Sequence, residues 1–143
     1  GMFSSLWGKF LRLFQFCAWV LISLLLVSSE RAPKNLVLDR PDVRQAIQKA
    51  WAKTEARTDG TEYCFTVNPS NIISYTGVPY SCTMTVYPQT IATVHTHPLW
   101  SAVEPSARDR QDAVETKIPF YVISKHQVWA ALPDGSAAFV SYR

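Results

Sequence analysis

Glycine, charge and internal repetition are all sparse in this sequence, and each scarcity excludes a class of protein. Only 5 of 143 residues are glycine and 17% are charged, while 13% are aromatic. This composition excludes a largely disordered or low-complexity chain. The sequence shows no internal repeat, and its length suits one domain of ordinary size with a real hydrophobic core.

An excess of positive charge is also missing from most of the chain. The formal net charge is +3, but Lys9 and Arg12 lie in the first 29 residues, and the remainder has 12 basic and 11 acidic side chains. No basic stripe remains on that part. Nucleic acid is therefore not an expected partner, because clustered Lys and Arg are its usual footprint.

A long apolar run near the N-terminus is typical of an export or membrane signal. Gly1, which precedes the Met, is interpreted as a remnant of cloning and left out of fold reasoning. Residues 13–27 are almost entirely apolar, but this stretch is short for a hydrocarbon core of about 30 Å. Residues 10–29 are long enough to span it as a helix, if Arg12 extends to the headgroups.

The apolar run allows two placements for the rest of the chain. A signal peptide would be cleaved after Ser29, whereas an uncleaved signal anchor would keep Lys9 and Arg12 on the cytoplasmic side. An ordinary buried helix is disfavoured, because so small a domain could hardly cover it. We favour the anchor. Either alternative puts the remainder outside the cytoplasm, secreted or facing the periplasm or extracellular side, with residues 30–38 as a linker.

The cysteines are compatible with export. Cys17 belongs to the apolar run, which leaves Cys64 and Cys82 as a pair in the exported part. A disulfide between them is plausible in an oxidising compartment. Two buried free thiols are an equally acceptable interpretation, so the pairing stays open.

Residues 39–143 predict an α/β (α+β) domain: a mixed, largely antiparallel sheet flanked by helices. A first helix begins at Asp39-Arg40-Pro41 and ends near Thr58-Asp59-Gly60, and a second covers residues 107–117. The apolar face of the first helix comprises Val43, Ala46, Ile47, Ala50 and Trp51. Strand composition is found in residues 62–67, 72–75, 82–87, 90–95, 120–124, 128–132 and 137–142.

Two histidines on alternate residues are the most informative feature of the chain. His95 and His97 can point to the same side of a strand, because strand side chains alternate, and Pro98 then ends the strand. A catalytic zinc takes three N or O ligands and leaves one position open for water. Asp109 is placed to supply the third ligand, with Asp112, one helical turn later, as the fallback.

Ser106 and Asp109 also fit a purely structural role. The pattern Ser-x-x-Asp resembles a capping box at the start of the second helix. The two roles are compatible, since a helix start fixes the direction of the Asp109 side chain.

Three further residues have two interpretations each. Glu62 opens a strand and is either a solvated charge or a general base beside a metal. Trp100 either lines a substrate cleft or packs. His126 is expected to lie exposed in a turn and not to bind metal.

The segments His95-Thr96-His97-Pro98 and Pro105-Ser106-Ala107-Arg108-Asp109 together resemble the signature of the JAMM (MPN-type, JAB-like) zinc metalloproteases, bacterial type. That signature is an upstream Glu, then H-x-H-P, a loop, and S-x-x-D; the loop here is one residue longer than usual. The resemblance covers residues 39–143. It implies a JAB/MPN-like fold, related to the cytidine deaminases.

The resemblance also implies roles for individual residues. His95, His97 and Asp109 would hold Zn²⁺. Ser106 would hydrogen-bond near the developing oxyanion. Glu62 would transfer the proton as general base and acid, with Glu55 as the second choice.

The expected function is therefore zinc-dependent hydrolysis of peptide or isopeptide bonds in a peptide or protein substrate. The enzyme is expected to be exported or attached to the membrane through its N-terminal helix. An exported domain would not meet ubiquitin-like proteins, so a cell-envelope peptide or isopeptide crosslink is the more plausible target. The alternative is a JAB-fold interaction or effector module without protease turnover. A toxin-like effector using the same site is a third hypothesis.

Overall fold

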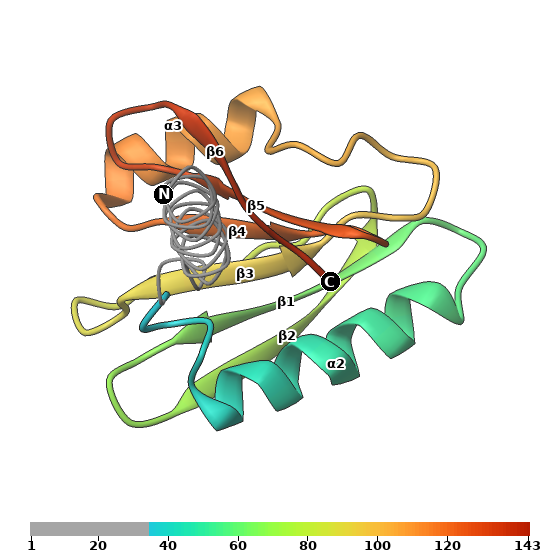
Figure 1. Ribbon diagram of the computed structural model, residues 1–143, viewed down its shortest axis with the longest axis horizontal. Coiled ribbons are helices and arrows are strands. Elements are labelled where there is room, and N and C mark those ends of the chain that lie inside the picture. The colour runs from blue at the N-terminus through green and yellow to red at the C-terminus, as the bar shows by residue number, and fades with distance from the viewer. Residues whose placement is uncertain (1–34) are drawn as a thin grey trace, which may run out of the picture. The chain divides into compact units, whose positions relative to one another are not determined.

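The computed structural model describes residues 35–143, which form two helices and six strands (Figure 1). In chain order the elements are α2 Pro41–Glu55, β1 Thr61–Val67, β2 Ile72–Pro79, β3 Ala92–Thr96, α3 Ala107–Thr116, β4 Phe120–Ile123, β5 Gln127–Ala131 and β6 Ala137–Tyr142. Both predicted helices are confirmed within two residues at their N-terminal ends. Helix α2 begins with Pro41 after Arg40, and α3 begins after Ser106.

The strands form one six-stranded sheet in the order β2-β1-β3-β4-β5-β6. Within the described residues, β3 and β4 pair in parallel, and the other four pairings are antiparallel. A parallel pair needs a long crossover, which here contains α3. The predicted mixed, largely antiparallel sheet with flanking helices is therefore confirmed.

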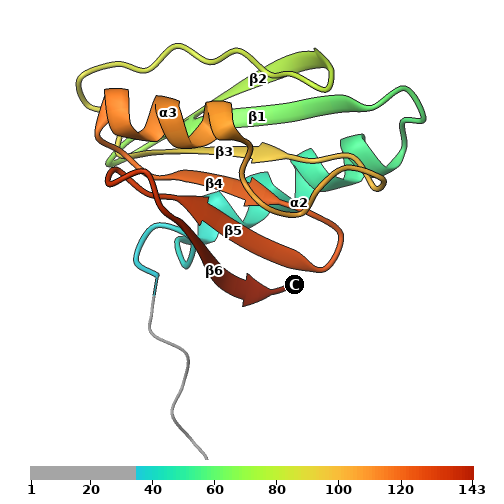
Figure 2. The ribbon, with the colours of Figure 1, turned by 90° about the horizontal axis from the view of Figure 1, so that it is seen from above.

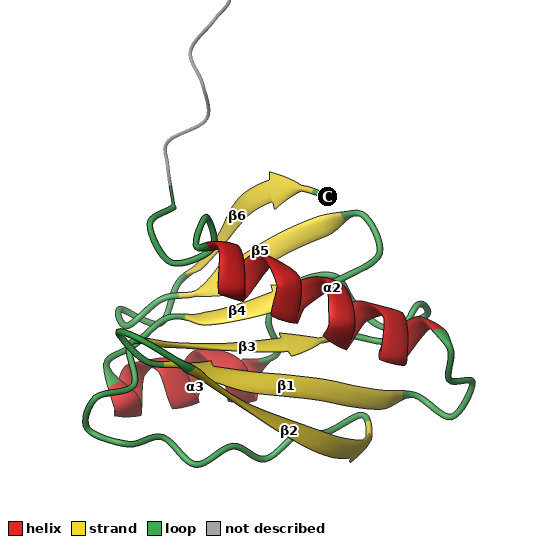
Figure 3. Cartoon of the chain, turned by 90° about the horizontal axis from the view of Figure 1, so that it is seen from below, coloured by secondary structure: helices red, strands yellow, loops and turns green. Residues whose placement is uncertain are grey.

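The two helices cover opposite faces of this sheet. Figure 3 shows α2 in front of the strands, and Figure 2, from the other side, shows α3 in front. Helix α2 buries Val43, Ala50 and Trp51, which is the face that its apolar spacing predicts. Helix α3 contributes the buried Ala113 to a smaller cluster with Phe120 and Ala131.

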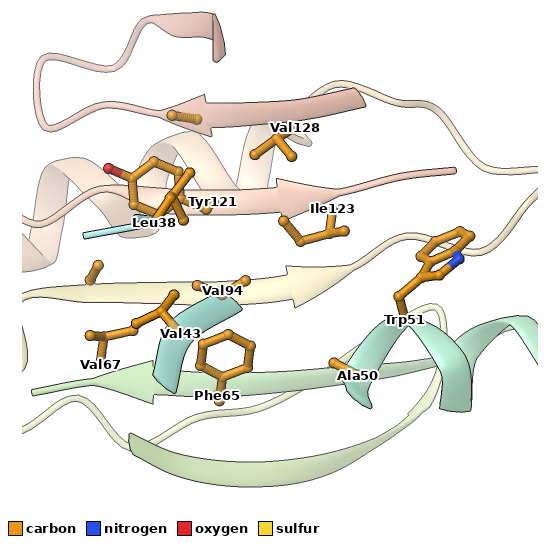
Figure 4. Packing of buried hydrophobic residues seen from close by; sticks show 12 residues of the cluster. Leu38, Val43, Ala50, Trp51, Phe65, Val67, Val94, Tyr121, Ile123 and Val128 are labelled. Carbon is orange, nitrogen blue, oxygen red and sulfur yellow. The ribbon is translucent and has the colours of Figure 1, made fainter. Parts of the chain in front are cut away.

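The main hydrophobic core lies between α2 and the sheet (Figure 4). The four inner strands β1, β3, β4 and β5 contribute alternate side chains to it, among them Phe65, Val94 and Ile123, all almost fully buried. Every residue of β3 is buried, because this strand is central and covered on both faces. The residues that alternate with the core therefore point to the α3 side of the sheet.

The strand predicted for residues 82–87 was wrong. After an isolated bridge between Val78 and Ser81, no backbone pairing continues, and residues 82–87 have no regular secondary structure. Their side chains do alternate, with Cys82, Met84 and Val86 half-buried between exposed neighbours. Alternating burial of side chains indicates that an extended segment packs on one side. It does not require that the backbone pair with a strand of the sheet.

The pairing of the two cysteines, which the sequence left open, is a disulfide. Cys64 in β1 is bonded to Cys82, 18 residues later. The bond attaches the irregular segment 82–87 to the middle of the sheet.

The folded region begins before the first helix. Asn35 lies in the predicted linker, and its side-chain oxygen accepts hydrogen bonds from the amides of Val37 and Leu38, each at 3.1 Å. Leu38 is buried in the main core. The predicted signal segment 1–29 lies outside the described residues. Within residues 35–143, neither helix has the length and apolar character needed to cross a membrane.

Candidate metal centre

The alternation of β3 sets the direction of His95. His95 pairs across the ladders with Cys64 of β1 and with Val122 of β4, and directly paired residues project to the same face of a sheet. Val94 and Thr96 point to the opposite, α2 side, where Val94 is a core residue. His97 follows the last residue of β3 and returns to the His95 side, as the i, i+2 spacing predicts.

The start of α3 sets the direction of Asp109. Ser106 is the N-cap, and its hydroxyl accepts the Asp109 amide at 3.1 Å. In return, one Asp109 oxygen accepts from both the amide and the hydroxyl of Ser106, each at 2.7 Å. This is the predicted capping box. It holds Oδ2 of Asp109 toward the helix start and leaves Oδ1 directed at His95.

His95, His97 and Asp109 converge, as the sequence predicted. The Nε2 atoms of the two histidines are 3.2 Å apart, and the Asp109 oxygens lie 3.3 Å from His95 Nε2 and 3.9 Å from His97 Nε2. Both histidines are about 95% buried, with 5% and 6% exposed. These three side chains can together hold a metal ion. Asp112, the fallback ligand, is instead bonded to Arg108 at 2.9 Å.

A backbone carbonyl fixes the tautomer of His97. His97 Nδ1 lies 2.6 Å from the carbonyl oxygen of Ala102. Because a carbonyl only accepts, Nδ1 carries the proton, and the lone pair of Nε2 faces Asp109. Metal-binding histidines are commonly oriented in this way. Sequence patterns could not identify Ala102, because the contribution comes from its backbone. His95 Nδ1, by contrast, is buried without a hydrogen-bond partner in the described residues.

The electrostatics of the cluster favour a charged Asp109. Burial alone would raise the pKa of this carboxyl, but hydrogen bonds from His95 and then Ser106 hold it well below its usual range. Burial tends to lower the pKa of His95, and the hydrogen bond and charge of Asp109 outweigh it, so the net shift is upward. Burial, followed by the charge of His95, lowers the pKa of His97. A carboxylate with two imidazole nitrogens is a suitable donor set for a divalent cation, whose binding requires both imidazoles to be neutral.

Glu62 lies beside this cluster. It precedes Cys64 by two residues in β1 and therefore shares the face on which His95 lies. It is 7% exposed, and burial raises the pKa of its carboxyl to about 7, an effect that His95 opposes and Asp109 reinforces. The structure thus excludes the interpretation as a solvated charge. Glu55, the second choice, is exposed at the end of α2 and does not line the site.

A cleft of about 860 Å³ opens over the cluster and contains Glu62 in its lining. One wall is the irregular segment after β2, including Tyr80, Cys82 and Met84; another is formed by the loop before α3 and its first turns, including Ser106 and Arg108. The first wall differs from the prediction, which gave residues 82–87 as a strand. The alternation of apolar and polar residues in this segment was a sign that one side of it packs against the protein.

Two remaining candidates lie outside the cluster. Trp100 is 53% exposed, and its Nε1 donates to the Tyr80 hydroxyl at 2.7 Å. The hydrogen bond joins the loop after β3 to the segment after β2. His126 is exposed in the β4–β5 turn, as predicted.

Comparisons of the chain with protein-family models, curated proteins and solved structures gave no significant match. Support for a function therefore comes from the geometry of the site.

Proposed function

We propose that this protein is a zinc-dependent hydrolase of peptide or isopeptide bonds, with the JAB/MPN-like fold of the JAMM metalloproteases. The convergence of His95, His97 and Asp109 in a buried cluster, with the buried carboxyl of Glu62 in the same cleft, is the observation that supports the proposal best. The four residues follow the order of the JAMM signature along the chain.

The donor set suits zinc in chemistry and spacing. Zinc–ligand bonds of about 2.0–2.2 Å in tetrahedral geometry put ligand atoms roughly 3.3 Å apart. Here the two Nε2 atoms are 3.2 Å apart, Asp109 Oδ1 lies 3.3 Å from His95 Nε2, and one ligand atom from each of the three residues lies within 4.8 Å of the others. Three protein ligands are typical of catalytic zinc sites, which keep a fourth position for water or substrate.

The proposed reaction divides its tasks between the metal and Glu62. A zinc ion at this site would supply Lewis acidity, which lowers the pKa of a water molecule and polarises the scissile carbonyl. Glu62 takes a proton from the attacking water and delivers it to the leaving nitrogen as the C–N bond breaks. The products are a carboxylate and an amine. In the metal-free site, burial raises the pKa of Glu62 to about 7; general acid–base catalysis is most efficient when the pKa of the group lies near the operating pH.

We infer that the enzyme acts outside the cytoplasm, membrane-anchored or secreted. The Cys64–Cys82 disulfide supports this, because such bonds persist in oxidising compartments. A peptide or isopeptide crosslink of the cell envelope is then the proposed substrate class. The proposed oxyanion role of Ser106 remains a prediction, since its hydroxyl donates to Asp109.

That hydrogen bond favours a second candidate function. A serine engaged in the capping box does not face a substrate carbonyl, and an interaction or effector module would need only the cleft, with or without a metal. The two candidates therefore differ in turnover.

Zinc analysis and a hydrolysis assay on the full chain distinguish the two candidates. We expect one zinc per chain, and cleavage of members of a peptide and isopeptide panel. Glu62→Gln should retain zinc and lose activity by about 10²–10⁴-fold, while the matched variant Glu55→Gln should retain both. Zinc binding without cleavage by the wild type would favour the interaction module. Full activity in Glu62→Gln would refute the role of Glu62, and absence of zinc would refute the hydrolase and favour a metal-free interaction module.

A further inference from the structure

The position of Glu62 is not fixed by regular strand pairing. The ladder between β1 and β3 ends at Cys64 opposite His95; continued by two residues, its register would put Glu62 opposite His97. On the other side, the pairing of β1 with β2 shifts between Thr61 and Tyr63. Glu62 thus lies at the irregularity of the β1–β2 ladder and beyond the last pair of the β1–β3 ladder.

The hydroxyl of Thr96 is hydrogen-bonded to the backbone next to Glu62. Thr96 lies between the two histidines and is completely buried, with its side chain on the α2 side of β3. Its Oγ1 accepts the amide of Tyr63 at 3.0 Å and lies 3.3 Å from the Tyr63 carbonyl oxygen. Tyr63 is the residue next to Glu62, so the hydroxyl replaces the missing ladder contact at that point.

Helix α2 completes the network. Thr54 Oγ1 is hydrogen-bonded to Thr96 Oγ1 and lies 3.1 Å from the Ala50 carbonyl oxygen. Each hydroxyl has one proton, so either Thr96 donates to Thr54 while Thr54 donates to Ala50, or Thr54 donates to Thr96 while Thr96 donates to the Tyr63 carbonyl; in both arrangements Thr96 accepts the Tyr63 amide. The contact therefore connects three elements: α2, β3 and the start of β1.

Other buried threonines of the sheet show that this arrangement is specific. Thr93 in β3 and Thr66 in β1 are also completely buried, yet neither hydroxyl has a hydrogen-bond partner in the described residues. A buried threonine in this sheet thus needs no polar partner to be accommodated. Thr96 differs because its hydroxyl is hydrogen-bonded to the backbone of Tyr63, the residue next to Glu62.

We propose that Thr96 is a positioning residue: its hydroxyl holds the Tyr63 backbone and so directs the Glu62 carboxylate toward the space beside His95 and His97. The proposal rests on the proposed hydrolase function for its catalytic consequence. Its structural part concerns only this chain's own hydrogen bonds.

The test compares three variants of the full chain. Thr96→Val removes the hydroxyl at nearly constant shape, Thr96→Ser retains it, and Thr93→Val removes an unpaired hydroxyl from the same strand. The first readout is hydrogen exchange of the Tyr63 amide in metal-free protein. Zinc stoichiometry, kcat and KM are the others.

We expect Thr96→Val to speed exchange of the Tyr63 amide about tenfold or more, because its acceptor is lost. Zinc stoichiometry should be unchanged. The kcat should fall about 10–100-fold with little change in KM, which is the effect of misplacing a reacting group. Thr96→Ser should restore both values, and Thr93→Val should not alter them.

Each alternative result has a definite meaning. Unchanged Tyr63 exchange and kcat in Thr96→Val would overturn the proposal, and so would a loss in Thr96→Ser equal to that in Thr96→Val. If Thr96→Val does not fold, Thr54→Val, which removes the second hydroxyl of the network, should give the same changes to a smaller extent. An inactive wild type would refute the hydrolase, while Tyr63 exchange and the carboxyl carbon shift of Glu62 would still decide whether Thr96 positions that side chain.

Discussion

Cys64 lies directly opposite His95 in the β1–β3 ladder, and its sulfur is bonded to Cys82 in the wall of the cleft. One covalent bond therefore connects the strand beside the metal ligands to a segment that has no ladder of its own. The wall around Met84 depends on this attachment, because regular backbone pairing ends at Ser81.

Removing the disulfide should destabilise the domain without abolishing the ligand cluster. For Cys64→Ala with Cys82→Ala, we expect the free energy of unfolding to fall by about 2–4 kcal/mol, since a loop of this size is no longer closed in the unfolded chain. Urea unfolding measures the loss, and limited proteolysis should cut first within residues 82–87. The reduced wild type is the control. Unchanged stability and unchanged cleavage would show that the wall is held by packing alone.

The raised pKa of Glu62 predicts a pH dependence of stability in the metal-free protein. The pKa of Glu62 is about 7 in the folded state against an ordinary value of 4.5, so the native state binds more protons than the unfolded state between these values. Stability therefore falls as pH rises through that window. Glu62→Gln should remove the fall and be more stable than wild type at pH 8, by up to about 3 kcal/mol.

Urea unfolding of both proteins from pH 5 to pH 8, in the presence of a chelator, measures this difference. Glu55→Gln should follow the wild type throughout. Parallel stability curves for wild type and Glu62→Gln would contradict the buried, uncharged state of Glu62 at low pH.

Ser106 should contribute to metal affinity through Asp109. Ser106→Ala removes the hydroxyl that donates to the carboxylate at 2.7 Å. We expect a loss of about 1 kcal/mol of stability from the missing N-cap, and metal binding weakened about tenfold because Asp109 is less well oriented. Ser136→Ala is the matched control, since its hydroxyl also bonds a carboxylate, Asp134, at 2.6 Å. If Ser106→Ala and Ser136→Ala bound metal equally well, the hydroxyl of Ser106 would serve only to cap the helix and would not contribute to metal affinity.

Gly77 should not tolerate a side chain. A Cβ added there would lie 2.8 Å from the Glu62 carbonyl oxygen and would also clash with the Ser81 carbonyl. Both neighbours are backbone atoms, so β1 or the cleft wall must move. We expect Gly77→Ala to cost about 1–3 kcal/mol and to reduce kcat through displacement of Glu62. Ser74→Ala, at an exposed position of β2, is the control for the strand; an equally stable and active Gly77→Ala would show that the two backbones separate easily.

The local features of the site were predictable because their causes are local. The alternation of a strand puts His95 and His97 on one side, and a Ser-x-x-Asp helix start orients Asp109. Pro41 and the apolar spacing of α2 likewise identified the helix and its buried face. In each case, residues within a few positions of one another determine the geometry.

Other features depend on residues that are distant in sequence. The contact of Ala102 with His97 involves a backbone atom, and the contact of Thr96 with Tyr63 joins residues 33 positions apart. Neither leaves a pattern in composition or periodicity. For residues 82–87 the pattern was present, but alternation cannot distinguish a strand from an extended segment packed on one side.

The sequence by itself thus determined the two helices, most of the strands and the set of residues that can bind a metal, because periodicity and helix capping are properties of neighbouring residues. Only the tertiary structure decided that Glu62 is buried beside that set, that Cys64 pairs with Cys82, and that β3 and β4 run parallel. These outcomes depend on which distant segments exclude water from one another, and hydrophobic burial acts between segments whatever their separation along the chain.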